Sequence, residues 1–191
     1  MEELKQAIER EGTGLGTDIV KVDSFLNHRI DTALVTAMGQ AFAEAFRADA
    51  PELILTVEAS GISLAVTAAQ ALGNLPVVFA KKGLHRNTAD DAYSAPIYSY
   101  TKGQTYQVQV SKKYLQPGAR VLIIDDFLAN GGATAGLRSI LSQAGCQLVG
   151  VGIGIEKGFQ PGGDALRGEG VKVVSLAIVD HIQDGRIILR S

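Results

Sequence analysis

Apolar residues recur along the chain with two spacings, one typical of amphipathic helices and one typical of buried strands. The spacing of Leu4, Ala7 and Ile8 predicts an N-terminal helix, and Asp31 is suited to cap a second helix. Continuous apolar runs such as LILTV at 53–57 predict strands that are buried on both sides. Helices are expected at 2–11, 32–47, 62–72 and 133–144, and strands at 18–22, 53–57, 76–80, 97–100, 105–110, 120–125, 147–155 and 171–179.

Strands and helices alternate through the middle of the chain, which indicates parallel strands joined by right-handed crossovers. The expected fold class is therefore α/β, with a mostly parallel sheet flanked by helices in a single domain over residues 1–191. Residues 97–110 are expected to form a hairpin, because a short KGQ turn separates two β-rich runs. Residues 12–17 (GTGLGT) are expected to be a loop, and the polar 83–96 segment is expected to be either a lid or disordered.

Composition narrows the class of protein. The chain has 46% hydrophobic residues and a formal net charge of −2, so no overall basic character favours nucleic acid or a membrane surface. No apolar run approaches the roughly 20 residues that span a bilayer, and the charged N-terminus is unlike a signal peptide. The lone Cys146 is compatible with a reducing compartment, so a cytoplasmic location is expected. The three histidines lack ligand spacing, which predicts no metal site from the protein alone.

The most informative stretch is VLIIDDFLANGGAT at residues 121–134. Asp125 and Asp126, the acid pair, stand at the expected carboxyl end of a strand, where open α/β sheets bind ligands. Small residues follow, and their backbone N–H groups at a helix start favour a phosphate. Because two carboxylates would repel an anion, they are expected to face hydroxyls, a divalent cation or developing positive charge. A phosphorylated sugar offers all three, although acids and glycines are also common in ordinary turns.

This stretch resembles the phosphoribosyl-diphosphate (PRPP) signature of the type I phosphoribosyltransferases, with Asn-Gly where the common signature has Thr-Gly or Ser-Gly. The segments KVDSFLNHRID, VEASGIS and GIEKGFQPGGD extend the resemblance, to a purine-salvage member of the family, over nearly the whole chain. It implies the type I phosphoribosyltransferase fold, with a small hood and a flexible loop, and a catalytic role for the acid pair. The PRPP-binding residues that it implies are Ala129, Asn130, Gly131, Gly132, Ala133, Ser60 and Gly61.

Residues 57–62 resemble the family's diphosphate loop, in which backbone amides hold the leaving group. Ser60 and Gly61 suit that task by size, although Ser60 is also an ordinary residue type for a helix cap. The resemblance further implies that Lys81 or Lys82 contacts the diphosphate, from the same subunit or across a homodimer interface. The alternative is that the two lysines form a solvated surface pair.

The resemblance also implies that Val20, Asn27 and Lys157 bind the base. A lysine side chain only donates hydrogen bonds, so Lys157 favours an exocyclic oxygen over an amino group, and hence a 6-oxopurine over adenine. Asn27 offers both a donor and an acceptor, as the edge of a dioxopurine requires. The family has leucine where this chain has Val20, a change that matters little if the contact is through the backbone; ordinary loop roles for Val20 and Asn27 are the alternative. Phe159 is suited either to stack on the base or to pack in the core.

The implied reaction is a displacement at the ribose anomeric carbon, in which N9 of a purine, with xanthine preferred, replaces the diphosphate of PRPP. Mg²⁺ carried with PRPP is the implied cofactor. Two other functions stay open on the sequence alone: a hypoxanthine-guanine phosphoribosyltransferase, and a regulator that binds PRPP without catalysis. A regulator of DNA or RNA is expected to show a basic face or a helix-turn-helix pattern, and the sequence has neither.

Overall fold

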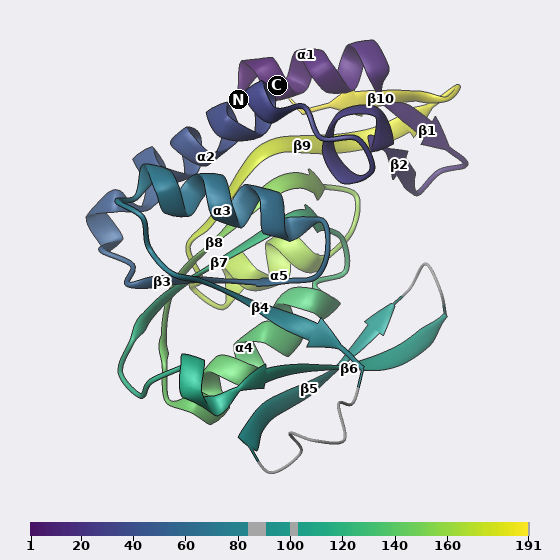
Figure 1. Cartoon of the computed structure of the whole chain (residues 1–191). Coiled ribbons are helices and arrows are strands. Elements are labelled where there is room, and N and C mark those ends of the chain that lie inside the picture. Colours follow the sequence, from purple (N-terminus) through teal and green to yellow (C-terminus); the bar gives the residue numbers. More distant parts are fainter. Residues whose placement is uncertain (84–90, 100–102, 191) are drawn as a thin grey trace.

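A computed structural model describes residues 1–83, 91–99 and 103–190 (Figure 1). Within these residues the main sheet has eight strands in the order β10-β9-β8-β7-β3-β4-β6-β5. The strands are β3 (Leu53–Val57), β4 (Val77–Lys82), β5 (Ala92–Ser99), β6 (Gln104–Ser111), β7 (Arg120–Leu128), β8 (Gln147–Lys157), β9 (Val173–Gln183) and β10 (Arg186–Leu189). The five central strands, from β9 to β4, are parallel, and β10, β6 and β5 pair antiparallel at the two edges. The prediction of a mostly parallel sheet is confirmed.

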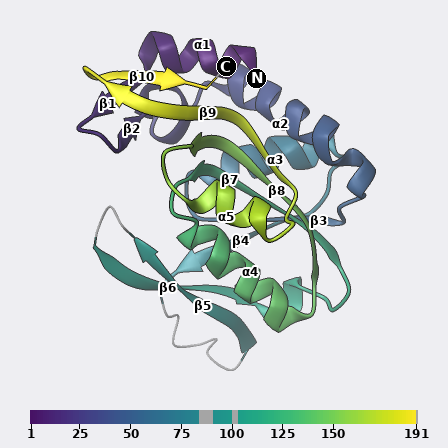
Figure 2. The ribbon, with the colours of Figure 1, turned by 180° about the vertical axis from the view of Figure 1, so that it is seen from behind.

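Helices cover both faces of this sheet. They are α1 (Glu2–Glu11), α2 (Thr32–Phe46), α3 (Gly61–Ala71), α4 (Gly132–Ala144) and α5 (Gly162–Gly168). Helices α2 and α3 lie on one face, and α4 and α5 lie on the other (Figures 1 and 2). Helix α2 begins where the sequence predicts, because the Asp31 carboxylate accepts hydrogen bonds from the backbone N–H groups of Ala33 and Leu34. In the described part of the chain, no helix is long and apolar enough to cross a membrane.

Strand β7 shows how the sheet generates two cores. Its side chains alternate, so that Leu122 and Ile124 pack with α2 and α3, whereas Val121 and Ile123 pack with α4. Each of these four residues is fully buried. A strand that is buried on both sides needs a continuous apolar run, which is the pattern that predicted it.

A small hood lies beyond the carboxyl ends of the central strands. It comprises α1, the hairpin of β1 (Thr13–Leu15) with β2 (Ile19–Lys21), the π-helical turn η1 (Asp23–Asn27) and β10 (Figure 1). The prediction of a loop at residues 12–17 is wrong for β1, which pairs with β2 and whose Gly14 N–H donates to Gly185 O at 2.9 Å. A three-residue strand rich in glycine carries too few side chains for its alternation to be read.

The polar 83–96 segment also differs from expectation. Residues 84–90 lie outside the described residues, but β5 already begins at Ala92, so the prediction of a lid or disorder is wrong for 92–96. Pro96 lies within β5, although proline is disfavoured inside strands. It is tolerated because β5 is the outermost strand, where one side of the backbone needs no partner. The expected hairpin is confirmed by the antiparallel pairing of β5 with β6.

Candidate active site

The acid pair lies inside strand β7, which continues to Leu128 and does not end at Asp125 as the sequence suggested. Asp125 and Asp126 are 4% and 7% exposed, and the backbone N–H of Asp126 donates to Asp125 Oδ1 at 3.0 Å. Burial, together with the neighbouring Asp126 carboxylate, raises the pKa of Asp125 well above its usual range. Two buried like charges are costly, so the pair is suited to a ligand that brings hydroxyl donors or positive charge.

The 129–133 loop follows β7 and leads into α4. Gly131 stands at the N-cap of α4 with φ of 83°, in the left-handed region that favours glycine. The first N–H groups of a helix have no acceptor within the helix, and they lie at the positive end of its dipole. All five predicted residues of this loop are half-buried rather than enclosed. The loop is therefore open to solvent at the start of α4, and its binding of a phosphate group stays a prediction.

The N-terminus of α3 lies against the acid pair. A Cβ at Gly61 would lie 2.9 Å from Asp125 Oδ1 and closer still to Thr56 Oγ1, so only glycine fits there. Ser60 occupies the N-cap position, but its hydroxyl makes no capping hydrogen bond, so the alternative of an ordinary serine cap is not supported. The Glu58–Ala59 peptide bond just before it is cis.

Thr56 was not predicted as a site residue. It is fully buried in β3, and its hydroxyl has no hydrogen-bond partner among the described residues. The available signal was its position as the one polar residue in the apolar run LILTV. The hydroxyl lies next to Gly61 at the N-terminus of α3, so this end of the sheet contains a buried polar group without a hydrogen-bond partner among the described residues.

The two lysines that the sequence could not tell apart are differently surrounded. The Lys82 backbone N–H donates to Glu58 Oε1 at 2.6 Å, which ties the end of β4 to the segment before α3. Its Nζ lies 5.3 Å from the ring centroid of Tyr106, and its charge counteracts part of the rise in the pKa of Asp125. Tyr106 is also influenced by the acid pair, because burial and the charge of Asp125 both raise the pKa of its hydroxyl. Lys82 is therefore electrostatically coupled to the acid pair.

Lys81 contacts different groups. Its Nζ lies 5.9 Å from the ring centroid of Phe79, and both residues line a cavity of about 400 Å³ together with Tyr114. Phe79 and Tyr114 are 37% and 55% exposed. Lys81 and Lys82 thus lie beside different rings at the end of the strand, and Lys82 is the one whose charge acts on Asp125.

The predicted base residue Lys157 lies at the end of β8, where this strand meets the hood. Lys157 Nζ donates to the backbone oxygen of Asp18 at 2.6 Å, so the lysine connects the end of β8 to the hood. Burial lowers the pKa of Lys157, and the Asp18 carboxylate opposes this shift. The side chain of Val20 is 8% exposed and belongs to the hydrophobic core, which leaves its backbone as the group available for a ligand.

Asn27 lies at the end of η1 and is exposed. It lines a cavity of about 330 Å³ together with Ser60, so the structure brings one predicted base residue next to the predicted diphosphate loop. Phe159 is 36% exposed, and the interpretation of this residue as a core aromatic is therefore wrong. Its stacking on a base stays a prediction.

Two glycines of α5 that the sequence analysis did not assign lie close to other segments, and the first of them contacts the 129–133 loop. The Gly162 N–H donates to Ala129 O at 3.0 Å, and a Cβ on Gly162 would lie 2.7 Å from Gly131 N and closer to Ala129 O. Gly163 instead lies against the carboxylate of Glu156. The available signal was the segment QPGGD, in which two glycines follow a proline at a helix start.

Metal ligands are scarce in the part of the chain that the structure describes. It contains no group of three or more His, Cys, Asp or Glu side chains that could hold an ion. The acid pair supplies two carboxylates, and Mg²⁺ is commonly bound through one or two carboxylates together with substrate phosphates. The residues present therefore fit an ion that arrives with a phosphorylated substrate.

Comparison with solved structures defines the class of protein. Adenine phosphoribosyltransferase from Rhodothermus marinus superposes with a TM-score of 0.72 at 22% identity, covering 93% of this chain and 97% of that chain. At this identity the likeness shows the fold alone. The fold is that of the type I phosphoribosyltransferases, and it carries the acid pair and the 129–133 loop at the carboxyl end of β7.

Comparison with known sequences then identifies the family. The chain is 52% identical over 187 residues to xanthine phosphoribosyltransferase from Laribacter hongkongensis, covering 98% of each protein. It is 49% identical over 190 residues to xanthine phosphoribosyltransferase from Clostridioides difficile, covering the full length of both. No protein-family model matches the chain. From these relatives, the chain belongs to the xanthine phosphoribosyltransferase family.

Proposed function

We propose that the chain is a pentosyltransferase that moves the 5-phosphoribosyl group of PRPP to N9 of xanthine, giving XMP and diphosphate in purine salvage. The observation that carries the proposal is the meeting of three elements at one end of the sheet. These are the buried acid pair of β7, the N-terminus of α3 against Asp125, and the 129–133 loop before α4. Full-length identity near 50% to xanthine phosphoribosyltransferases supports the choice of reaction and base.

Asp125 and Asp126 hold the ribose hydroxyls in this proposal. Buried carboxylates are strong acceptors, and the two hydroxyls of the ribose supply donors in addition to the backbone N–H of Asp126. Positive charge that develops on the sugar ring at the transition state also offsets the repulsion within the pair. The raised pKa of Asp125 supports this role, since it reports a charge that is costly without a ligand.

The phosphate groups of PRPP divide between two loops. The 129–133 loop binds the 5′-phosphate through backbone N–H groups at the start of α4. Ser60 and Gly61 at the start of α3 bind the diphosphate, with Lys82 as the nearby cation of the same subunit. Mg²⁺ carried with PRPP would be held by the diphosphate and the acid pair, and it supplies neutralisation of the leaving group's charge.

Xanthine is selected by donors near its two oxygens. Lys157 donates to an exocyclic oxygen, Asn27 presents its amide to the other end of the edge, and Val20 contributes its backbone. The hydrogen bond from Lys157 Nζ to Asp18 O supports a lysine already directed toward the hood. The neighbouring cavity that Asn27 shares with Ser60 supports a base bound close to the diphosphate.

The proposal extends to the surroundings of the site. We infer a single phosphoribosyltransferase domain over residues 1–191, a homodimer, and a cytoplasmic location. Exposed Phe79 and Tyr114 around the cavity that Lys81 lines support an interface on that face, because exposed apolar clusters commonly mark contacts with other chains. Sedimentation analysis of the purified protein tests the dimer.

Turnover with four bases tests the function. Rates are measured with PRPP and Mg²⁺ on xanthine, guanine, hypoxanthine and adenine under identical conditions, with PRPP binding titrated separately. The expected result is the highest kcat/KM with xanthine and little activity with adenine. Preference for hypoxanthine or guanine would make the chain a hypoxanthine-guanine phosphoribosyltransferase. Binding of PRPP without turnover of any base would identify a non-catalytic regulator.

A further inference from the structure

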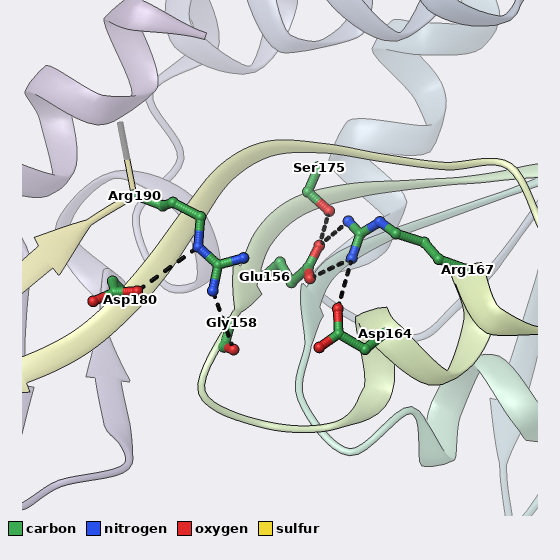
Figure 3. A network of polar contacts seen from close by, with 7 residues as sticks. All are labelled: Glu156, Gly158, Asp164, Arg167, Ser175, Asp180 and Arg190. Atoms are coloured by element: carbon green, nitrogen blue, oxygen red, sulfur yellow. Dashed lines mark hydrogen bonds and ion pairs between the residues drawn. The ribbon is translucent and has the colours of Figure 1, made fainter.

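An ion pair joins the buried carboxylate of Glu156 to Arg167, whose side chain is partly exposed (Figure 3). The Glu156 side chain is 2% exposed, and both of its oxygens accept hydrogen bonds from Arg167, at 2.8 Å to Oε1 and 2.6 Å to Oε2. The Ser175 hydroxyl donates to the same carboxylate. Glu156 lies on β8, Arg167 on α5 and Ser175 on β9, so the carboxylate connects three elements.

Burying a carboxylate in such a pair is not an efficient way to stabilise a fold. Desolvation of Glu156 offsets much of its attraction to Arg167, and well-packed apolar residues of similar volume often do as well or better. A bidentate pair does fix geometry, because the planar guanidinium accepts only one orientation of its partner. The arrangement therefore favours a role in positioning the segments that lie next to the ion pair.

The pair reaches the 129–133 loop through two adjacent glycines. A Cβ on Gly163 would lie 2.6 Å from Glu156 Cδ and 2.7 Å from Arg167 Nη1, so the backbone there lies flat against the ion pair. The preceding Gly162 lies flat against the loop and donates to Ala129 O. The first two residues of α5 are thus packed between the ion pair and the loop, and neither has a side chain that could adjust to a shift of its neighbours.

The same carboxylate precedes Lys157 in β8. In the β7–β8 ladder Glu156 stands opposite Leu128, the last residue before the 129–133 loop. On the far side of the lysine, Arg190 Nη2 donates to Gly158 O at 3.4 Å, as Figure 3 shows. The residues on either side of Lys157 are therefore both fixed by arginines, Glu156 by Arg167 and Gly158 by Arg190.

We propose that Glu156 is a positioning residue: through Arg167, Gly163 and Gly162 it seats the 129–133 loop for the 5′-phosphate of PRPP. This inference rests on the proposed function for the identity of the ligand. The role differs from that of a catalytic residue, because the carboxylate is enclosed by Arg167, Ser175 and Gly163 and only 2% of the side chain is exposed for contact with a ligand. A 5′-phosphate is bound alike in the ground state and the transition state, so loss of the seating weakens PRPP binding more than it slows the chemical step.

Two variants and a matched control test the role. Glu156→Gln keeps the shape and removes the charge, whereas Gly163→Ala keeps every charge and pushes the α5 backbone off the ion pair. Gly168→Ala is the control, since it adds the same methyl group to the same helix at a position with nothing within 4 Å. The deciding measurement is the Kd for PRPP by titration calorimetry with Mg²⁺ and without base. Steady-state kcat, the KM for PRPP and the melting temperature accompany it.

The expected result is a Kd and KM for PRPP that rise about tenfold or more in both variants, with kcat within about threefold of the parent, and no change in the control. A lower melting temperature with unchanged PRPP affinity would show a merely structural pair and overturn the proposal. If Glu156→Gln does not fold, Gly163→Ala decides alone. Parent protein that binds PRPP but turns over no base contradicts the proposed function, whereas unchanged PRPP affinity in the variants contradicts only the positioning role.

Discussion

Gly162→Ala is the substitution for which the structure gives the clearest magnitude. The added methyl carbon would lie 2.7 Å from Gly131 N and closer still to Ala129 O, whereas ordinary contacts begin near 3.4 Å. Both neighbours are backbone atoms, which cannot rotate away, so the 129–133 loop and α5 must separate by roughly 1 Å at this point. The hydrogen bond from the Gly162 N–H to Ala129 O, now 3.0 Å, would lengthen with them.

A displacement of about 1 Å in a group that orients substrate can cost roughly 100-fold in rate, which corresponds to about 2.7 kcal/mol. The expected result for Gly162→Ala is therefore a kcat/KM for PRPP that falls by about that factor. Helix α5 itself should not suffer, because alanine is a better helix former than glycine by about 1 kcal/mol.

The assay measures initial rates of XMP formation at saturating xanthine with PRPP varied. Gly168→Ala, in the same helix and with open space around its Cβ, is the matched control and is expected to equal the parent. Circular dichroism and the melting temperature check that each variant is folded. A folded Gly162→Ala protein whose kcat/KM lies within threefold of the control would refute the reasoning, since the loop would then tolerate a displacement that the proposed function forbids.

Four further predictions concern the acid pair, the two base residues Lys157 and Asn27, and the Glu156 ion pair. The double variant Asp125→Asn and Asp126→Asn should lose about 100-fold or more in kcat, and near-normal turnover would exclude the assigned role. Its free energy of unfolding at pH 7 should stay equal or rise, because burial raises the pKa of Asp125 and the charged form therefore destabilises the fold. Lys157→Met should lower kcat/KM for xanthine about tenfold or more. Asn27→Ala should narrow the preference for xanthine over hypoxanthine with PRPP affinity unchanged. Rates on the four bases measure both effects, and an unaltered ranking of the bases would show that other residues recognise the base. Burial alone would raise the pKa of the Glu156 carboxyl, but the hydrogen bond and charge of Arg167 hold this pKa below its usual 4.5. The stabilisation from the ion pair is therefore present above pH 4.5 and is lost as pH falls through the lowered pKa. In urea unfolding measured against pH, Glu156→Gln should lose less free energy of unfolding on acidification than the parent, and equal losses in the two proteins would contradict this prediction.

The parallel centre of the fold could be predicted because its signals are local. Strands β3 and β7 are continuous apolar runs, and Asp31 caps α2 as its position before a helical pattern indicates. The elements that were missed are short or polar and depend on neighbours. β1 gains its strand conformation from pairing with β2 and from contact with Gly185, and β5 tolerates Pro96 because it is an edge strand.

The candidate site divides in the same way. Asp125, Asp126 and the 129–133 loop are contiguous in sequence, so their chemistry could be inferred from that one stretch of residues. Thr56 and Gly162 could not be assigned in this way, because each acts through a contact with a segment distant in sequence, Thr56 with the start of α3 and Gly162 with the loop. The divergence of Lys81 and Lys82 is likewise set by the strands and rings beside them.

The sequence by itself determined the α/β class and the site's contiguous motif, and through its resemblance to a known family it determined the kind of reaction. These rest on properties that a short stretch of chain carries with it: hydrophobic period, helix caps, and the size and charge of adjacent side chains. Only the tertiary structure decided that Glu156 is enclosed by Arg167, Ser175 and Gly163, and that Lys157 binds the hood at Asp18. The physical reason is that packing and electrostatic coupling depend on distances in space, and chain folding brings together residues such as Asp18 and Lys157 that no local pattern connects.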